Sequence, residues 1–157
     1  MHEKKFDEAV VRFYRCLEGI IQYQLRKYSI DTSHPTLSSI GETEVEKFLE
    51  MIGKKSLPEN LSLFEGYLLL KDILKDKFTQ KIDFDRIRGL MFARNHSILA
   101  HGTQVIKRET AMKFYKNIEH IIRLLFEEEN INFQKTSEDG RFLEIAREEF
   151  YLIMAPL

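Results

Sequence analysis

Apolar residues recur at spacings of three and four along most of the chain, which is the period of an α-helix that buries one side. The clearest case predicts a long first helix over residues 6–28. Its apolar positions are Phe6, Ala9, Val10, Phe13, Leu17, Ile20, Ile21 and Leu25. We expect its polar residues to face solvent, although contact with RNA or a second subunit is an alternative. These polar residues are Arg12, Arg15, Glu18, Gln22 and Gln24.

Similar spacing predicts further helices over residues 42–52, 61–75, 84–101 and 109–129. Gly53 is placed to end the first of these. In the segment 61–75 we expect one apolar stripe to face inward. It consists of Leu61, Phe64, Leu68 and Leu69, continued by Ile73 and Leu74. Turn-forming residues over 29–41 predict a connecting loop, and the polar interval 76–83 predicts a break.

The tail after Asn130 fits two predictions. Its apolar spacing favours a helix, whereas Ser137-Glu138-Asp139-Gly140 is also typical of a hairpin turn. We favour the helix. The chain as a whole is therefore predicted to be all-α, a bundle of about five helices in a single domain over residues 1–157.

Composition and charge narrow the class of protein. The chain is 43% hydrophobic and 31% charged with 3 Pro and 7 Gly, which indicates an ordered protein. Its net charge of −1 gives no general attraction to nucleic acid, although a local basic surface is compatible with it. Cys16 is a single cysteine, so no disulfide forms within the chain. Without a signal peptide or a membrane-spanning stretch, we expect a soluble cytoplasmic protein.

The candidate chemistry lies in Arg94-Asn95-His96-Ser97-Ile98-Leu99-Ala100-His101-Gly102. His101 follows Arg94 by seven residues, which on a helix brings the two side chains within about 20° of one direction. A guanidinium can stabilise the charge of a pentacoordinate phosphate, and an imidazole can move a proton near neutral pH. Together they suit cleavage of RNA by its own 2′-hydroxyl, without a metal or a cofactor.

The neighbouring polar residues have supporting assignments. Ser97 lies on the stripe between Arg94 and His101, so it is predicted either to touch substrate or orient His101, or to bond back to a helix carbonyl. Asn95 is placed to orient Arg94 or to bond across a subunit interface. His96 is a candidate for substrate binding or orientation. It points about 140° away from His101 on a helix, which argues against a shared zinc ion.

The stretch resembles the Arg-x4-6-His motif of HEPN ribonucleases, including the Asn after the Arg. Residues 6–18 are also similar to the start of the HEPN region in type III CRISPR-associated accessory ribonucleases. This resemblance implies an all-helical HEPN domain that forms a homodimer and cleaves single-stranded RNA but not DNA. It assigns Arg94 and His101 as catalytic residues and Asn95 as a supporting one, in antiviral defence.

Relatives in this group carry a CARF domain that senses cyclic oligoadenylate before the HEPN region. Only five residues precede Phe6, so we expect that sensor to be missing from this chain. The chain is then either one domain of a regulated enzyme or a standalone, toxin-like ribonuclease. A further alternative is a non-catalytic module for dimerisation or RNA binding, since an Arg and a His at this spacing also occur by chance.

Overall fold

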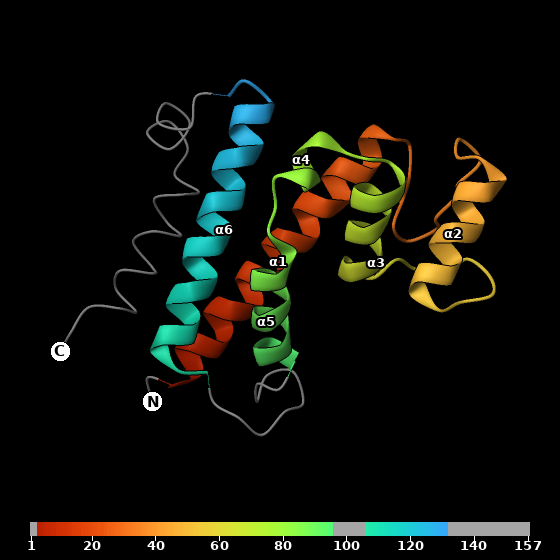
Figure 1. Cartoon of the computed structure of the whole chain (residues 1–157). Coiled ribbons are helices and arrows are strands. Elements are labelled where there is room, and N and C mark those ends of the chain that lie inside the picture. Colours follow the sequence, from red (N-terminus) through yellow and green to blue (C-terminus); the bar gives the residue numbers. More distant parts are fainter. Residues whose placement is uncertain (1–2, 96–105, 132–157) are drawn as a thin grey trace. The chain divides into compact units, whose positions relative to one another are not determined.

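The computed structural model describes residues 3–95 and 106–131, and within these ranges the backbone forms helices and turns without a strand (Figure 1). This confirms the prediction of an all-α protein. The helices are α1 (Glu3–Lys27), α2 (Glu42–Ile52), α3 (Leu63–Leu68), the π-helix η1 (Leu69–Ile73), α4 (Lys77–Gln80), α5 (Phe84–Asn95) and α6 (Arg108–Glu128). None of these helices is long and apolar enough to cross a membrane.

The chain divides into two compact units that share α1. The first unit comprises residues 1–15 and 82–157, and the second comprises residues 16–81. The start of α1 therefore belongs to the first unit and the rest of α1 to the second. The single domain over residues 1–157 stays a prediction.

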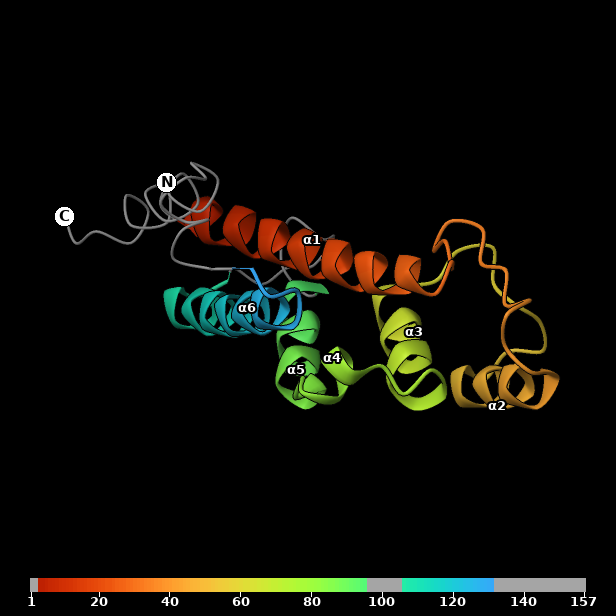
Figure 2. The same cartoon turned by 90° about the horizontal axis from the view of Figure 1, so that it is seen from above.

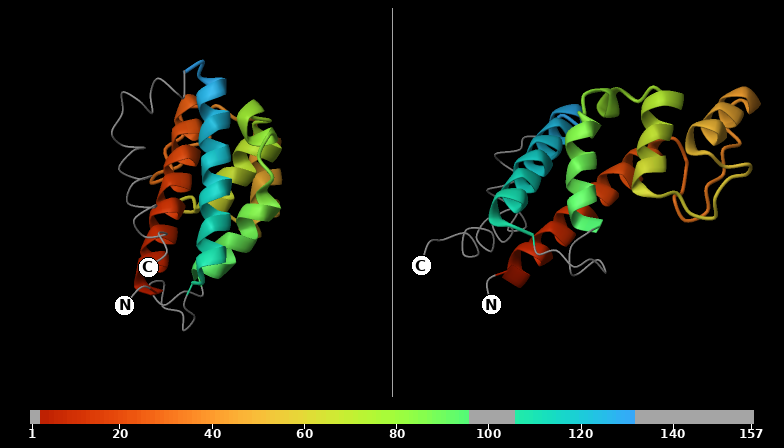
Figure 3. Two further views of the ribbon diagram at one scale, coloured as in Figure 1. Left: turned by 90° about the vertical axis from the view of Figure 1, so that its left-hand side faces the viewer. Right: turned by 60° about the horizontal axis from the view of Figure 1, so that its bottom comes forward.

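In the first unit, α5 and α6 run antiparallel and side by side (Figures 1 and 3). The start of α1 packs with them, and the rings of Phe13 and Tyr115 join α1 to α6 with their centroids 5.9 Å apart. Apolar side chains from all three helices are buried here. These are Ala9, Val10, Phe84, Ile87, Ala111, Phe114, Ile118 and Ile121.

In the second unit, α3 lies beside the last turns of α1 (Figure 2). The approach is close at Gly66, where an added Cβ would lie 3.0 Å from Ile21 and 3.1 Å from Leu25. A larger residue at this position would require these two core side chains to shift by a few tenths of an ångström, so the close packing favours glycine.

The prediction that Phe64 points inward is wrong, since this residue is 40% exposed. Phe64 lies on another side of the helix from the buried residues of α3 and η1, so that Leu69 is buried as predicted but Phe64 is not. The buried residues are Leu63, Glu65, Gly66, Tyr67, Leu69 and Leu70. Spacing alone fits either stripe because apolar residues fill most positions of this segment. Contact with α1 at Gly66 selects the observed one.

The end of α2 follows the sequence closely. Gly53 adopts a left-handed backbone with φ of 67°, and its N–H donates to the Glu50 carbonyl. The predicted helix over 42–52 and its glycine stop are both confirmed.

The interval 76–83 is not simply a break, because it contains the short helix α4. Asp76 caps this helix, accepting a hydrogen bond of 2.8 Å from the Thr79 N–H. It also accepts one from the Tyr28 hydroxyl at 3.0 Å. Phe78 and Thr79 are buried, so the interval contributes to the core despite its polar composition. The bundle thus has one α-helix more, within the described ranges, than the five predicted.

Gln24 corrects the prediction that the polar side of the first helix is solvated. This residue is 1% exposed, and neither its amide nitrogen nor its amide oxygen has a hydrogen-bond partner among the described residues. It falls on the buried stripe of α1, one turn after Ile20 and Ile21. The long apolar stem of glutamine can pack there, while its amide is buried without a hydrogen bond to the described residues, which costs free energy.

Two predictions about helix extent fall on residues without a described structure. The helix predicted over 84–101 corresponds to α5 up to Asn95, and its continuation to His101 lies outside the described ranges. The same holds for the tail beyond Ile131, including the choice between helix and hairpin. The helix predicted over 109–129 is confirmed as α6.

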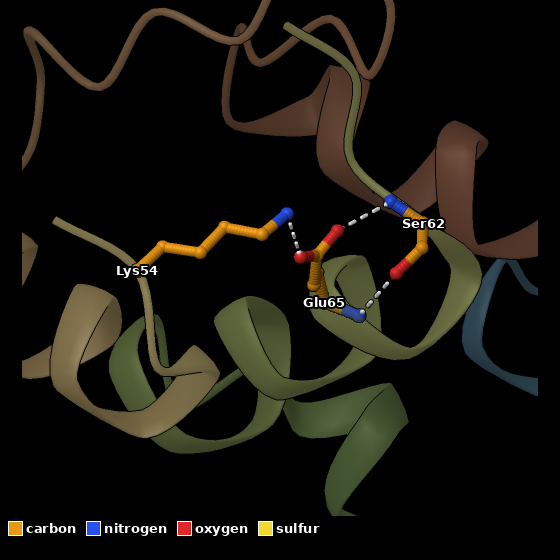
Figure 4. A network of polar contacts seen from close by, with 3 residues as sticks. All are labelled: Lys54, Ser62 and Glu65. Carbon is orange, nitrogen blue, oxygen red and sulfur yellow. Dashed lines mark hydrogen bonds and ion pairs between the residues drawn. The ribbon is translucent and has the colours of Figure 1, made fainter. Parts of the chain in front are cut away.

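A polar network fixes the start of α3 (Figure 4). The Ser62 hydroxyl accepts from the Glu65 N–H at 3.3 Å, and the Glu65 carboxylate accepts from the Ser62 N–H at 2.8 Å, which forms a capping box. Lys54 lies 2.6 Å from the same carboxylate. Burial by itself raises the pKa of Glu65, but the bonds from Lys54 and Ser62 outweigh it and hold the pKa below its ordinary value.

This network predicts a pH-dependent part of the stability. The ionised Glu65 stabilises the folded state fully above the unfolded pKa of about 4.3, and this contribution is lost as the pH falls through the lower folded pKa. We expect Glu65→Gln to reduce the free energy of unfolding by about 1 kcal/mol at pH 7 and to flatten its decline below pH 4.5. Urea unfolding at several pH values measures this. Glu59→Gln, at an exposed position, is the control, and equal pH profiles for the two variants would contradict the prediction.

Candidate functional site

The site predicted from the sequence begins at the last turn of α5, where Arg94 and Asn95 end the helix. Arg94 is half-buried and Asn95 is exposed. The Arg94 Nη1 donates a hydrogen bond of 3.0 Å to the Asn95 Oδ1. This hydrogen bond is the contact that the predicted orienting role of Asn95 requires.

Tyr14 of α1 supplies the second contact of Arg94. The Arg94 Cζ lies over the Tyr14 ring, 4.4 Å from its centroid, which is well within the range of a cation–π interaction. The Arg94 Nε is buried and has no hydrogen-bond partner among the described residues. The guanidinium is therefore held by a ring face and by one amide, with at least one of its five N–H donors unused.

Asp7, on the same side of α1, holds the chain that returns to α6. Its Oδ1 accepts from the Ile106 N–H at 3.3 Å, and the residue is 2% exposed. Tyr14 follows Asp7 by seven residues, so the two project within about 20° of each other and about 10 Å apart along the helix. Contacts to α1 thus fix the chain on both sides of the segment 96–105.

The remaining predicted site residues are His96, Ser97 and His101, and all three lie in the part of the chain without a described structure. The predicted shared direction of Arg94 and His101 therefore stays a prediction. For metal binding, no group of three or more His, Cys, Asp or Glu side chains gathers within residues 3–95 and 106–131.

Sequence reasoning missed Tyr14 and Asp7 as members of the site. A signal for them was present, since both fall on the side of the first helix that buries Val10 and Leu17. A buried carboxylate on an apolar stripe requires a hydrogen-bond donor. Which donor it finds, here Ile106, depends on how the helices pack.

Cys16, near this region on α1, has the environment expected of a small packed residue. It is partly buried, and burial raises the pKa of its thiol, which favours the protonated form. A protonated thiol is a poor nucleophile, so the structure gives Cys16 no chemical role beside Arg94.

Taken together, these residues define a helical protein whose only described candidate for chemistry is a half-buried guanidinium, the group best suited to bind a phosphodiester. The family model of the Csm6 HEPN domain matches residues 1–125, and the chain belongs to this family. The family is CRISPR-associated. The resemblance seen in the sequence is thereby confirmed. A comparison with curated proteins finds no match.

The Asp7 contact predicts a local effect on stability. Asp7→Ala leaves the Ile106 N–H buried without its acceptor, and we expect the free energy of unfolding to fall by about 1–3 kcal/mol. Asp7→Asn keeps a side-chain oxygen that can accept this bond, so its loss should be smaller. Hydrogen exchange of the Ile106 amide measures the effect at the site, and unchanged exchange in Asp7→Ala would contradict it.

Proposed function

We propose that this protein is an endoribonuclease that cleaves single-stranded RNA without a metal ion, with Arg94 as its electrostatic group. The observation that carries the proposal is the state of Arg94, held by the Tyr14 ring and Asn95 with a buried Nε that lacks a hydrogen-bond partner among the described residues. A prearranged cation with unused donors is what the extra negative charge of a phosphoryl transition state requires. Membership of the Csm6 HEPN family supports RNA as the substrate.

The proposed reaction needs no protein nucleophile. The ribose 2′-hydroxyl attacks the adjacent phosphorus, the bond to the 5′ oxygen breaks, and a 2′,3′-cyclic phosphate and a 5′-hydroxyl remain. His101 is the proposed proton carrier, either taking the 2′-hydroxyl proton or protonating the leaving 5′ oxygen. Ser97 and His96 are proposed to bind or orient substrate. DNA lacks the 2′-hydroxyl and should be inert.

We further propose that two copies of the chain complete the site. The reaction has two proton transfers, whereas one motif supplies a single His101. A twofold dimer through α5 would bring two motifs together. Phe92 of α5 supports an interface there, because it is 65% exposed and lies beside the exposed positions Arg88 and Gly89. A ring on this exposed side of α5 is available to pack against the same side of a second copy.

In the cell, we propose a role in CRISPR-linked antiviral defence. Control by cyclic oligoadenylate would require a CARF domain, either joined to this chain or supplied by a partner. A toxin-like role without that control is the alternative.

The first prediction of this proposal concerns Arg94 and cleavage. We expect wild-type protein to cleave labelled single-stranded RNA in EDTA, and Arg94→Ala or His101→Ala to slow cleavage at least about a hundredfold, which corresponds to about 2.7 kcal/mol of lost transition-state stabilisation. A substrate with 2′-deoxyribose at the cleaved position should stay intact, and the product ends should be a cyclic phosphate and a 5′-hydroxyl.

The control is Arg123→Ala, which removes an exposed arginine of α6 whose ion pair with Glu119 lies on the surface. It should cleave like wild type. If wild type and Arg94→Ala both show equal, negligible cleavage, the proposed endoribonuclease activity is refuted. If the RNA binds and is recovered intact, a non-catalytic binding module is favoured.

The second prediction concerns the dimer. Phe92→Glu should raise the dissociation constant of the dimer at least about tenfold and lower cleavage in parallel, because it puts a charge where we expect an apolar contact. Phe64→Glu, at an exposed Phe of α3, should change neither. Sedimentation velocity over a concentration series measures the dimer. Cleavage by a wild-type monomer, or full activity in mixed dimers of wild-type and His101→Ala chains, would contradict a shared site.

A further inference from the structure

We propose that Tyr14 is a positioning residue for Arg94, which it holds by its ring face so that the guanidinium keeps both its charge and its donors for the phosphate. This inference rests on the proposed function and extends it to a residue outside the motif. Tyr14 lies on α1 and Arg94 at the end of α5, so the contact joins two helices of the first unit.

The group that holds Arg94 determines whether its charge and its N–H donors stay available to bind a phosphate. A carboxylate beside Arg94 would occupy its N–H groups and cancel its charge. The ring face does neither, because a cation–π contact engages the plane of the guanidinium and not its edges. The Arg94 Cζ, 4.4 Å from the ring centroid, is thus restrained by a group that carries no charge.

Asn95 determines which edge of the Arg94 guanidinium is not occupied by its own amide. It accepts from Nη1, so the edge formed by Nε and Nη2 lies on the other side of the guanidinium. The buried Nε, which lacks a partner among the described residues, belongs to that edge. Tyr14 and Asn95 together therefore fix the plane of the guanidinium and the direction of this edge.

The part of α1 that carries Tyr14 is well packed. Val10, one turn earlier on α1, is fully buried, and the adjacent Phe13 packs against Tyr115 of α6. Asp7 on the same side of α1 holds Ile106. A half-buried ring on a packed segment of helix restricts Arg94 more than a ring on a loose segment would, and a restricted catalytic group loses less entropy when the transition state forms.

The test compares Tyr14→Leu, which removes the ring, with Tyr14→Phe, which keeps it. We expect Tyr14→Leu to lower kcat for RNA cleavage about tenfold with a smaller change in KM, and Tyr14→Phe to keep most of the activity. The matched control is Tyr23→Leu, which removes from the same helix a ring that lies under Lys27, with Nζ 5.2 Å from the ring centroid. That variant should cleave like wild type.

A spectroscopic readout separates positioning from folding. The Arg94 Nε–H resonance, assigned by its loss in Arg94→Lys, should show a ring-current shift in wild type and in Tyr14→Phe but not in Tyr14→Leu. Equal kcat for wild type and Tyr14→Leu would overturn the role of Tyr14, and so would a Tyr14→Phe variant that keeps the shift but loses activity. If wild type shows the ring-current shift but does not cleave RNA, the proposed ribonuclease activity is refuted, whereas the contact between Tyr14 and Arg94 is not.

Discussion

The apolar side of α1 is the constraint on which the described structure depends. Val10, Leu17, Ile21 and Leu25 are at most 2% exposed, and they extend over both compact units of the chain. Burial of such side chains is the main favourable contribution to folding. Because the packing of Val10 fixes the start of α1 within the first unit, it also fixes the side chains that project from the same stripe there. Tyr14 thereby holds Arg94 before residues 96–105, and Asp7 holds Ile106 after them.

Three cation–π contacts occur in the described part of the chain, and they differ in what they restrain. Lys27 over Tyr23 and Lys71 over Tyr67 each link residues four apart in one helical segment. Such pairs are local, and they add little beyond helix formation. Arg94 over Tyr14 joins α5 to α1 and has the shortest distance of the three. It therefore depends on tertiary packing, as a contact that orients a functional group should.

Most of the helices could be predicted because their apolar residues repeat with the helical period. The limits of α2 follow from its spacing and from Gly53, whose left-handed backbone suits glycine. The errors arose where composition and packing disagree. Phe78 and Thr79 are buried in a segment rich in charged residues, where a side-chain cap from Asp76 permits the short helix α4. Two single residues were also predicted wrongly: Phe64 is apolar but exposed, and Gln24 is polar but buried.

By itself the sequence determined the all-α class, the extent of the main helices and the family, because these follow from local periodicity and from residues in fixed order along the chain. It also placed Asn95 beside Arg94, since neighbouring residues at a helix end can bond to each other directly. The tertiary structure alone decided that Tyr14 lies against Arg94 and that Asp7 holds Ile106. Both contacts join residues far apart in sequence, and their distance in space is set by how the helices bury their apolar sides, which no single segment specifies.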